Sequence, residues 1–221
     1  MIFADRQDAG ARLAKELARF KDADPVVIAL PRGGVPVAFE VAQALDAPLD
    51  VVVVRKIGAP SEPGLPIAAV VDGDRADTVI EDILQGISPP QAWLRDQVAR
   101  ELREIDQQRR RYGSDTNRPH VRGKTAILVD DGVATGTTTR AALRAVRRLQ
   151  PKRLVLAVPV APAAVLAALR ADVDEAVCLA TPSSFGAVGQ FYRDFPTVDD
   201  AAVRDLLARA PHRAPPAAAG P

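Results

Sequence analysis

The sequence predicts an α/β fold, a doubly wound domain around a mainly parallel sheet, and three observations support this expectation. Short apolar runs without alternation are typical of strands that are buried on both faces. Amphipathic stretches of helical periodicity separate most of these runs. Glycine and charged residues follow several of the runs directly, where ligands bind at the carboxyl edge of a parallel sheet.

The first part of the chain predicts one βαβ unit behind an N-terminal helix. Apolar residues recur at helical spacing over residues 10–20, which predicts an amphipathic helix. The apolar runs 26–30 and 51–54 predict two strands, and the stretch 37–45 between them predicts a helix. A strand, a loop, a helix and a second strand at this spacing form one crossover unit of a parallel sheet.

The middle of the chain differs in character and is expected to be an insertion over residues 57–123. Residues 57–66 are too rich in glycine and proline for regular structure. An Asp-Gly-Asp turn divides the apolar stretches of residues 67–80, which predicts a hairpin. A long helix is expected over residues 89–111, with apolar side chains on one face and an end at Gly113.

The second half returns to alternating strands and helices. Strands are predicted at 125–131, 153–160 and 175–180, and helices at 140–149, 162–171 and 199–210, the last one capped at Asp199 or Asp200. With five strands of parallel type, residues 1–210 are expected to form a single domain. Residues 211–221 lack core-forming side chains and are expected to be disordered.

Composition and charge exclude several classes of protein. The chain has 29 Lys and Arg against 28 Asp and Glu, so a broad basic surface for nucleic acid is not expected. The single cysteine, Cys178, rules out an intramolecular disulfide framework. Apolar runs fall short of the ~18–20 residues of a membrane helix, and the charged N-terminus does not resemble a signal peptide. We therefore expect a cytoplasmic protein that binds neither nucleic acid nor membranes.

The motif ILVDDGVATGTTT, residues 127–139, carries the clearest functional information. Its strand ends in Asp130 and Asp131 at the expected carboxyl edge of the sheet. The glycines and threonines that follow offer backbone amides and hydroxyls at the start of a helix, which suit a phosphate. Two carboxylates beside a phosphate suit vicinal sugar hydroxyls, so the motif predicts a phosphorylated ribose as ligand. The simpler alternative is an aspartate pair that ends a strand before a threonine-rich helix cap.

This motif resembles the signature of the type I phosphoribosyltransferases, in which four apolar and two acidic residues precede a short loop of Thr and Gly. The resemblance implies the type I fold, with Asp130 and Asp131 holding the 2′- and 3′-hydroxyls of phosphoribosyl pyrophosphate. Gly132 departs from the pattern, because most members carry an aliphatic residue there. The loop that is implied to hold the 5′-phosphate consists of Ala134, Thr135, Gly136, Thr137 and Thr138.

A second motif, ALPRGGVP, stands where type I enzymes hold the pyrophosphate, in a loop after the first core strand. The resemblance implies that Arg32 supplies charge there, and that Gly33 and Gly34 supply backbone amides. Taken alone, the motif would be a tight turn. Arg55 and Lys56 precede a loop that in relatives closes over the reaction centre, and they are further candidates for binding pyrophosphate. A solvated strand end is the alternative for these two.

The chain up to about residue 210 also resembles a narrower bacterial group of stand-alone phosphoribosyltransferase-domain proteins. The stretches FADRQDAGARLA, PLDVVVVRKIGAP and VGQFYRDF carry this resemblance. The chain departs from the group at Gly64, where an acidic residue is usual, and at Gln107 and Gln108, where an arginine pair is common. In type I proteins a variable hood near the C-terminus recognises the acceptor, and residues 181–200 are the expected hood loop.

The resemblance implies an enzyme that binds phosphoribosyl pyrophosphate with Mg²⁺ and transfers phosphoribose to an unidentified nitrogenous small molecule, with release of pyrophosphate. Asp130, Asp131 and Arg32 are expected to carry catalysis by fixing the ribose and stabilising the leaving group. Phe185 and Tyr192 are candidates for stacking on the acceptor, and the alternative is that these aromatic residues pack the hood itself.

Alternatives of other classes stay open at this stage. The fold also serves as a non-catalytic phosphoribosyl pyrophosphate-binding module in some regulators, although the chain offers no spare segment or charge excess for DNA. P-loop and dinucleotide binding are disfavoured, since neither GxxxxGK[ST] nor GxGxxG is present. A homodimer is one possible assembly, and the sequence identifies no protein ligands for a metal.

Overall fold

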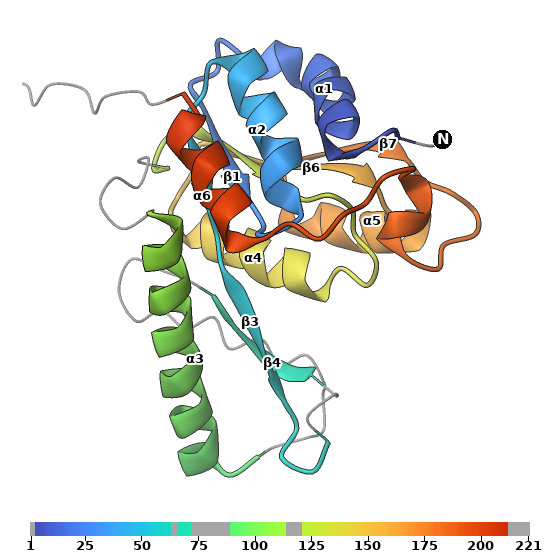
Figure 1. Ribbon diagram of the computed structural model, residues 1–221. Helices are drawn as coiled ribbons and strands as arrows, with labels where there is room; N and C mark the ends of the chain where they lie inside the picture. The colour runs from blue at the N-terminus through green and yellow to red at the C-terminus, as the bar shows by residue number, and fades with distance from the viewer. Residues whose placement is uncertain (1–2, 63–65, 72–88, 114–120, 212–221) are drawn as a thin grey trace, which may run out of the picture.

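The computed structural model describes residues 3–62, 66–71, 89–113 and 121–211. Figure 1 shows two parts, a sheet with helices on both faces, which we call the body, and an arm that projects from it. The arm consists of β3 (Val54–Gly58), β4 (Pro66–Val71) and α3 (Gln91–Tyr112).

The body contains a five-stranded sheet in which every neighbouring pair of strands is parallel. In spatial order the strands are β2 (Leu49–Val51), β1 (Pro25–Ala29), β5 (Thr125–Val129), β6 (Arg153–Val160) and β7 (Glu175–Ala180). The predicted doubly wound parallel sheet is thereby confirmed. The second strand is displaced from its predicted range, 51–54, because the chain leaves the sheet after Val51 and Val54 already belongs to β3.

Helices cover both faces of this sheet, so alternate residues of each strand enter two different cores. One face is covered by α1 (Arg6–Leu17), α2 (Gly34–Leu45) and α6 (Asp200–Arg209), and the other by α4 (Thr137–Arg148) and α5 (Ala163–Leu169). Along β1, Val27 and Ala29 enter the first core, and Val26 and Ile28 enter the second. Burial on both faces explains the unbroken apolar runs in the sequence. Short 3₁₀ turns lie at Ala18–Phe20, Arg170–Asp172 and Val188–Phe191.

The arm contains a hairpin that precedes the one predicted over residues 67–80, most of which falls outside the described ranges. β3 pairs antiparallel with β4, with Val54 opposite Val71. The expectation that residues 57–66 lack regular structure was wrong at both ends, because Ile57 and Gly58 complete β3 and Pro66 begins β4. Backbone pairing with a neighbouring strand outweighs the weak strand preference of glycine and proline at these ends.

Two predicted loops lie at helix N-termini, because the helices begin earlier than expected. α2 begins at Gly34 and α4 at Thr137, earlier than the expected starts at 37 and 140. The first N–H groups of a helix lack partners within the helix, so these positions favour anions. Two predicted helix caps are confirmed: Gly113, whose φ is 71°, caps the C-terminus of α3, and the Asp199 side chain caps α6 by accepting from the Ala202 amide.

Two expectations fall on residues outside the described ranges. These are the Asp-Gly-Asp turn at 72–74 and the disordered tail beyond Pro211. Within the described ranges, none of the helices combines the length and the apolar character needed to cross a membrane.

Candidate functional site

The two sequence motifs meet at the switch point of the sheet. β2 lies on one side of β1, whereas β5, β6 and β7 follow on the other side. The order in which the strands are added to the sheet therefore reverses between β1 and β5. The loops after two such strands diverge and leave a crevice at the carboxyl edge, where ligands bind in doubly wound folds. Ala29 pairs with Val129 in the register, and both strands therefore end at the same level.

Two glycines allow these loops to touch. A methyl group at Gly33 would lie 2.0 Å from Oδ2 of Asp131, and one at Gly34 would lie 2.9 Å from Cα of Asp130. Gly34 is held by its own amide, which donates to the carbonyl of Leu30 at 3.0 Å. The predicted pyrophosphate turn and the predicted ribose-binding acids are thus in direct contact, because neither glycine carries a side chain.

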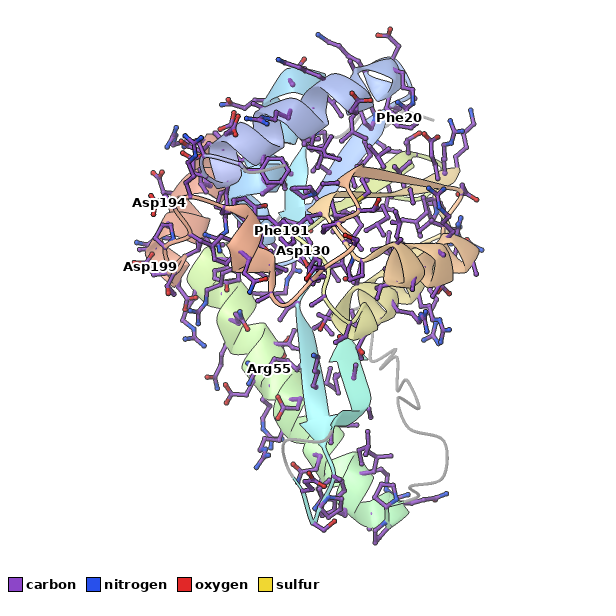
Figure 2. The ribbon with its side chains drawn as sticks, turned by 90° about the vertical axis from the view of Figure 1, so that its right-hand side faces the viewer. Phe20, Arg55, Asp130, Phe191, Asp194 and Asp199 are labelled. Carbon is purple, nitrogen blue, oxygen red and sulfur yellow. The ribbon has the colours of Figure 1, made fainter. Side chains whose placement is uncertain are left out.

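The two acids lie at the centre of the molecule, where the arm joins the body; Figure 2 labels Asp130 there. The Asp131 amide donates to Oδ1 of Asp130 at 2.9 Å, which fixes the first carboxyl against the backbone. Oδ2 of Asp131 accepts from Nε of Arg6 at 2.8 Å, and the Asp131 side chain is only 14% exposed. The pair therefore has one carboxylate matched to a cation and one held mainly by a backbone amide.

Burial and mutual repulsion disfavour ionisation of this pair. Desolvation, followed by the charge of Asp131, raises the pKa of Asp130 well above its ordinary value. Desolvation also raises the pKa of Asp131, although the Arg6 guanidinium opposes that shift. Neighbouring carboxylates whose charges are costly are typical of sites that act on a ligand.

A cavity of about 670 Å³ opens beside the acids. Its lining comes from the sheet edge, the arm and the chain that precedes α6: Arg6, Pro31, Arg32, Gly33, Val53, Val54, Arg55, Gln108, Asp130, Asp131, Val188, Phe195, Pro196, Thr197 and Val198. The volume lies in the range of small-molecule and cofactor pockets. A ligand here would touch both sequence motifs at once.

Arg6 and Phe195 line this cavity but were not predicted as site residues. The Arg6 guanidinium donates from Nη1 to the carbonyl of Pro196 at 2.7 Å, and its Cζ lies 3.7 Å from the centre of the Phe195 ring. Both residues belong to stretches that carried the family resemblance, FADRQDAGARLA and VGQFYRDF. The charge of Arg6 within the first stretch was the indication of a site residue that the sequence offered. The contact between Arg6 and Phe195 arises only in the fold, which brings the two ends of the chain together.

Arg32 lies between the cavity and the helices α3 and α6. Its Nε is 3.0 Å from Oδ1 of Asp200, an ion-pair distance, although this buried oxygen accepts no hydrogen bond from the described residues. The approach is therefore not aligned as a hydrogen bond. Arg111 also pairs with Asp200, at 3.4 Å, and Gln108 donates to the Tyr112 hydroxyl at 2.6 Å. Arg32 thus has an acidic partner nearby, but this partner does not fix the orientation of its side chain.

The structure separates the two basic residues of β3. Arg55 lines the cavity, and its Nε donates to Oε2 of Glu101 on α3 at 3.0 Å. Figure 2 shows it on the arm. Lys56, the next residue, is exposed and is not among the cavity-lining residues. Only Arg55 is therefore placed to reach a ligand in this cavity without movement of the arm.

The Thr-rich loop continues from the acids into α4. Ala134 and Thr135 are exposed, and Gly136 has a φ of 79°, a backbone conformation that favours glycine. Thr137 and Thr138 form the first turn of the 12-residue helix. None of these five residues is among those lining the cavity. They lie directly after the acids in the chain, at a helix N-terminus that suits a phosphate.

Gly132, the departure from the family pattern, has a structural reason. A methyl group at this position would lie 2.6 Å from Cγ1 of Val188 and 3.0 Å from Cγ1 of Val160. Val188 belongs to the predicted hood loop and lines the cavity. An apolar side chain from the hood therefore occupies the space that an aliphatic residue in the motif would fill.

The two predicted acceptor residues lie away from the cavity lining. The Tyr192 ring is 6% exposed and packs against Phe3 and Phe195, with centroid distances of 5.3 and 4.8 Å. Its hydroxyl donates to the carbonyl of Asp131 at 2.5 Å. Phe185 pairs with Phe191 at 5.1 Å. These contacts favour the alternative interpretation, that the aromatic residues pack the hood.

The family of the chain follows from comparison with known proteins. A family model described as the phosphoribosyl transferase domain matches residues 4–196. The match covers the acids, the Arg32 turn and the Thr-rich loop, together with nearly the whole cavity lining.

Relatives extend the match over most of the chain. A Mycobacterium tuberculosis protein, found in two strains and named as a candidate phosphoribosyl transferase, is 43% identical over 212 residues, which cover 96% of this chain and 47% of that protein. The chain thus spans about half the length of the curated relatives it matches. A crystal structure of a Thermus thermophilus protein matches with a TM-score of 0.81 and 42% identity, covering 94% of this chain and 98% of that one. The chain belongs to the phosphoribosyltransferase family.

Proposed function

We propose that this cavity binds phosphoribosyl pyrophosphate as its magnesium complex, and that the protein transfers the phosphoribosyl group to a nitrogenous acceptor. One observation carries the proposal: the Gly33 turn and the Asp131 carboxylate are close enough that a single methyl group could not fit between them. A site that contacts the diol and the diphosphate of one ligand at once needs both groups of residues in one place.

At the ribose end, the carboxylates of Asp130 and Asp131 would accept from the two vicinal hydroxyls. A carboxylate offers several lone pairs, so Oδ2 of Asp131 can remain with Arg6 while Oδ1 accepts from the sugar. Hydrogen bonds to charged groups are the stronger kind, and fixing the ring in one orientation would supply much of the catalytic effect. The 5′-phosphate would lie at the N-terminus of α4, on Thr135 to Thr138.

At the diphosphate end, Arg32 and the backbone of Gly33 and Gly34 would stabilise the charge that develops on the leaving group. Arg55 would approach the same group from the arm. The described residues contain no group of three or more His, Cys, Asp or Glu that could hold a metal by itself. Magnesium would therefore enter as part of the substrate, because it takes most of its ligands from phosphate oxygens and water.

The acceptor would lie against the apolar part of the cavity. This part is formed by Val53, Val54, Val188, Phe195, Pro196 and Val198. The Phe195 ring already contacts Arg6 and Tyr192, so we expect aliphatic walls, and not an open aromatic face, to hold the acceptor. The polar atoms of Gln108 and Thr197 at the lining would then orient its nitrogen.

Titration calorimetry with phosphoribosyl pyrophosphate and Mg²⁺ tests the ligand assignment. The wild type should bind, and the double variant Asp130→Asn/Asp131→Asn should lose affinity by roughly a hundredfold or more, because two charged acceptors are lost. Asp205→Asn is the matched control, since this exposed aspartate lies on α6 away from the cavity lining. Equal affinity in wild type and double variant, or no binding to either, would overturn the assignment.

A second measurement tests turnover. The protein is incubated with the same ligand and a panel of nucleobases, orotate and amines, and released pyrophosphate is assayed. Acceptor-dependent release that the double variant lacks would establish the transferase. Binding without release across the whole panel would favour the non-catalytic module.

A further inference from the structure

Arg6 joins three parts of the cavity through one guanidinium. Its Nε donates to Oδ2 of Asp131 at 2.8 Å, its Nη1 donates to the Pro196 carbonyl at 2.7 Å, and its Cζ lies 3.7 Å from the Phe195 ring centre. Arg6 is 8% exposed, although it is a charged residue in the first turn of α1. These contacts link the N-terminal helix, the acid pair and the chain that precedes α6.

A buried guanidinium is stable only when its charge and its donors are matched, and here the Asp131 carboxylate and the Pro196 carbonyl match them. Arg6 in turn stabilises the charge of the acids. Within the described part of the chain, Arg6 is the cation that pairs with the acids, and neither acid has another ion-pair partner. Without it, two neighbouring carboxylates would face an anionic ligand uncompensated.

The contact also fixes the direction of the Asp131 carboxyl. Oδ2 faces both Arg6 and the backbone of Gly33, so Oδ1 is the oxygen left to accept from a ligand. The same guanidinium contacts Phe195 and Pro196, which also line the cavity. One side chain therefore sets both the orientation of an acid and the position of a neighbouring part of the cavity lining.

We propose that Arg6 is a positioning residue, which holds the Asp131 carboxyl oriented for the sugar hydroxyl and ties the segment Phe195–Pro196 over the ligand. The inference rests on the proposed function, because it names how one predicted ribose-binding acid is prepared. Lysine cannot replace arginine in this role. A single ammonium group cannot donate to Asp131 and to Pro196 while lying flat on Phe195.

The chain offers a closely matched control in Arg12. This residue lies on the same helix, pairs with Asp8 at 2.8 Å and lies 5.5 Å from the ring centre of Phe3. It resembles Arg6 in residue type, ion pair and aromatic contact, but it does not line the cavity. A general effect of losing an arginine from α1 should therefore appear in both Arg6→Lys and Arg12→Lys.

The test compares affinities for phosphoribosyl pyrophosphate with Mg²⁺ in wild type, Arg6→Lys and Arg12→Lys. We expect a loss of roughly tenfold to a hundredfold in Arg6→Lys, and a change below about twofold in Arg12→Lys. In Arg6→Ala, guanidinium ions below denaturing concentration should restore part of the lost affinity without raising the melting temperature. The same ions should not change the affinity of Arg12→Ala.

Each outcome decides a different point. Binding by wild type with equal affinity in Arg6→Lys would overturn the inference and leave the proposed function in place. A folded Arg6→Ala variant that guanidinium ions do not rescue would also overturn it. If Arg6→Lys failed to fold, Arg6 would be a determinant of the fold and the positioning role would be rejected. No binding by the wild type would overturn the proposed function, and the inference with it.

Discussion

The cavity has two walls that are built in different ways. The first, which we call the sheet wall, consists of Gly33, Asp130 and Asp131, at the ends of two hydrogen-bonded strands. The second, which we call the outer wall, consists of cavity-lining side chains from the arm and from the chain before α6, among them Arg55, Gln108 and Phe195. Backbone geometry places the residues of the sheet wall, with Arg6 orienting the Asp131 carboxyl, whereas contacts between side chains alone position the outer wall.

This difference predicts different responses to substitution. In the sheet wall a methyl group would meet its neighbour at 2.0 Å, and the buried core beneath it leaves little room for adjustment. In the outer wall Arg55 is 41% exposed and is held by one ion pair, an interaction that solvent weakens. We expect abrupt losses of function from the first wall and graded losses from the second.

The largest effect should come from Gly33→Ala. The φ of Gly33 is −60°, so alanine fits the backbone and the change is purely steric. The new methyl group must displace the Asp131 carboxyl, and a displacement of about 1 Å at such a site costs on the order of a hundredfold. Affinity for phosphoribosyl pyrophosphate, measured by calorimetry, should therefore fall by at least this factor.

Gly113→Ala supplies the control for that loss. Gly113 has a φ of 71° and open space around its Cα, so alanine there strains the backbone by about 1 kcal/mol but contacts nothing. Its melting temperature should fall while its affinity stays at the wild-type level. Wild-type affinity in Gly33→Ala would show that the sheet wall adapts, and the contrast between the walls would be lost.

A second prediction uses the pH dependence of stability. Burial and the charge of Asp131 raise the pKa of Asp130 above its ordinary 3.8, so the folded protein retains a proton that the unfolded chain releases. Stability therefore decreases as pH rises between 3.8 and the raised pKa, and the full cost remains above it. Asp130→Asn should raise the melting temperature at neutral pH and lose this advantage below pH 3.8.

The carboxyl of Asp174 should affect stability with the opposite pH dependence. A hydrogen bond from Arg147, assisted by the Leu154 amide, lowers the pKa of this carboxyl, so its stabilising effect is present above 3.8 and is lost as pH falls through the lowered pKa. Asp174→Asn should lower the melting temperature at neutral pH. If both variants shifted in the same direction, the Asp130 carboxyl would not be the unfavourably ionised group that the sheet wall implies.

The sheet wall could be predicted from the sequence, and the reason is local. The apolar runs identify the strands, and the residues that follow parallel strands lie at the carboxyl edge of the sheet. Arg32 and Asp130 are therefore expected to be neighbours once their strands are recognised as adjacent and parallel. The helix starts at Gly34 and Thr137 were missed by three residues, because glycine and threonine have a weak preference for helix interiors.

The outer wall could not be predicted in the same way. Arg6 and Pro196 meet across 190 positions of the chain, and nothing in their local sequence specifies this contact. Arg55 was expected near the pyrophosphate, directly after the end of a strand over residues 51–54, whereas it lies within β3. A run such as VVVVRKIG is equally compatible with the end of one strand and the start of another. Tyr192 was considered for the acceptor, and only its packing against Phe3 assigns it to the hood core.

A third prediction concerns the two basic residues of β3. Arg55→Ala should weaken affinity for phosphoribosyl pyrophosphate by about fivefold to tenfold, because one partly exposed charge at the diphosphate is removed. Lys56→Ala should change it by less than about twofold, since Lys56 is exposed and does not line the cavity. Calorimetry at two salt concentrations measures both, and the Arg55 effect should shrink at the higher one. A larger loss in Lys56→Ala would mean that the arm moves on binding.

The smallest effect, and the only gain in affinity, is expected from Asp200→Asn. Asp200 lies 3.0 Å from Arg32 Nε without an aligned hydrogen bond, so its charge reduces the attraction of Arg32 for an anion more than it orients the side chain. Removing that charge should tighten binding of pyrophosphate by about twofold to threefold. Asp205→Asn, on the same helix and paired with Arg209, should have no effect. Weaker binding in Asp200→Asn would instead show that Asp200 orients Arg32, which would extend the precise positioning of the sheet wall to the helices that pack beside it.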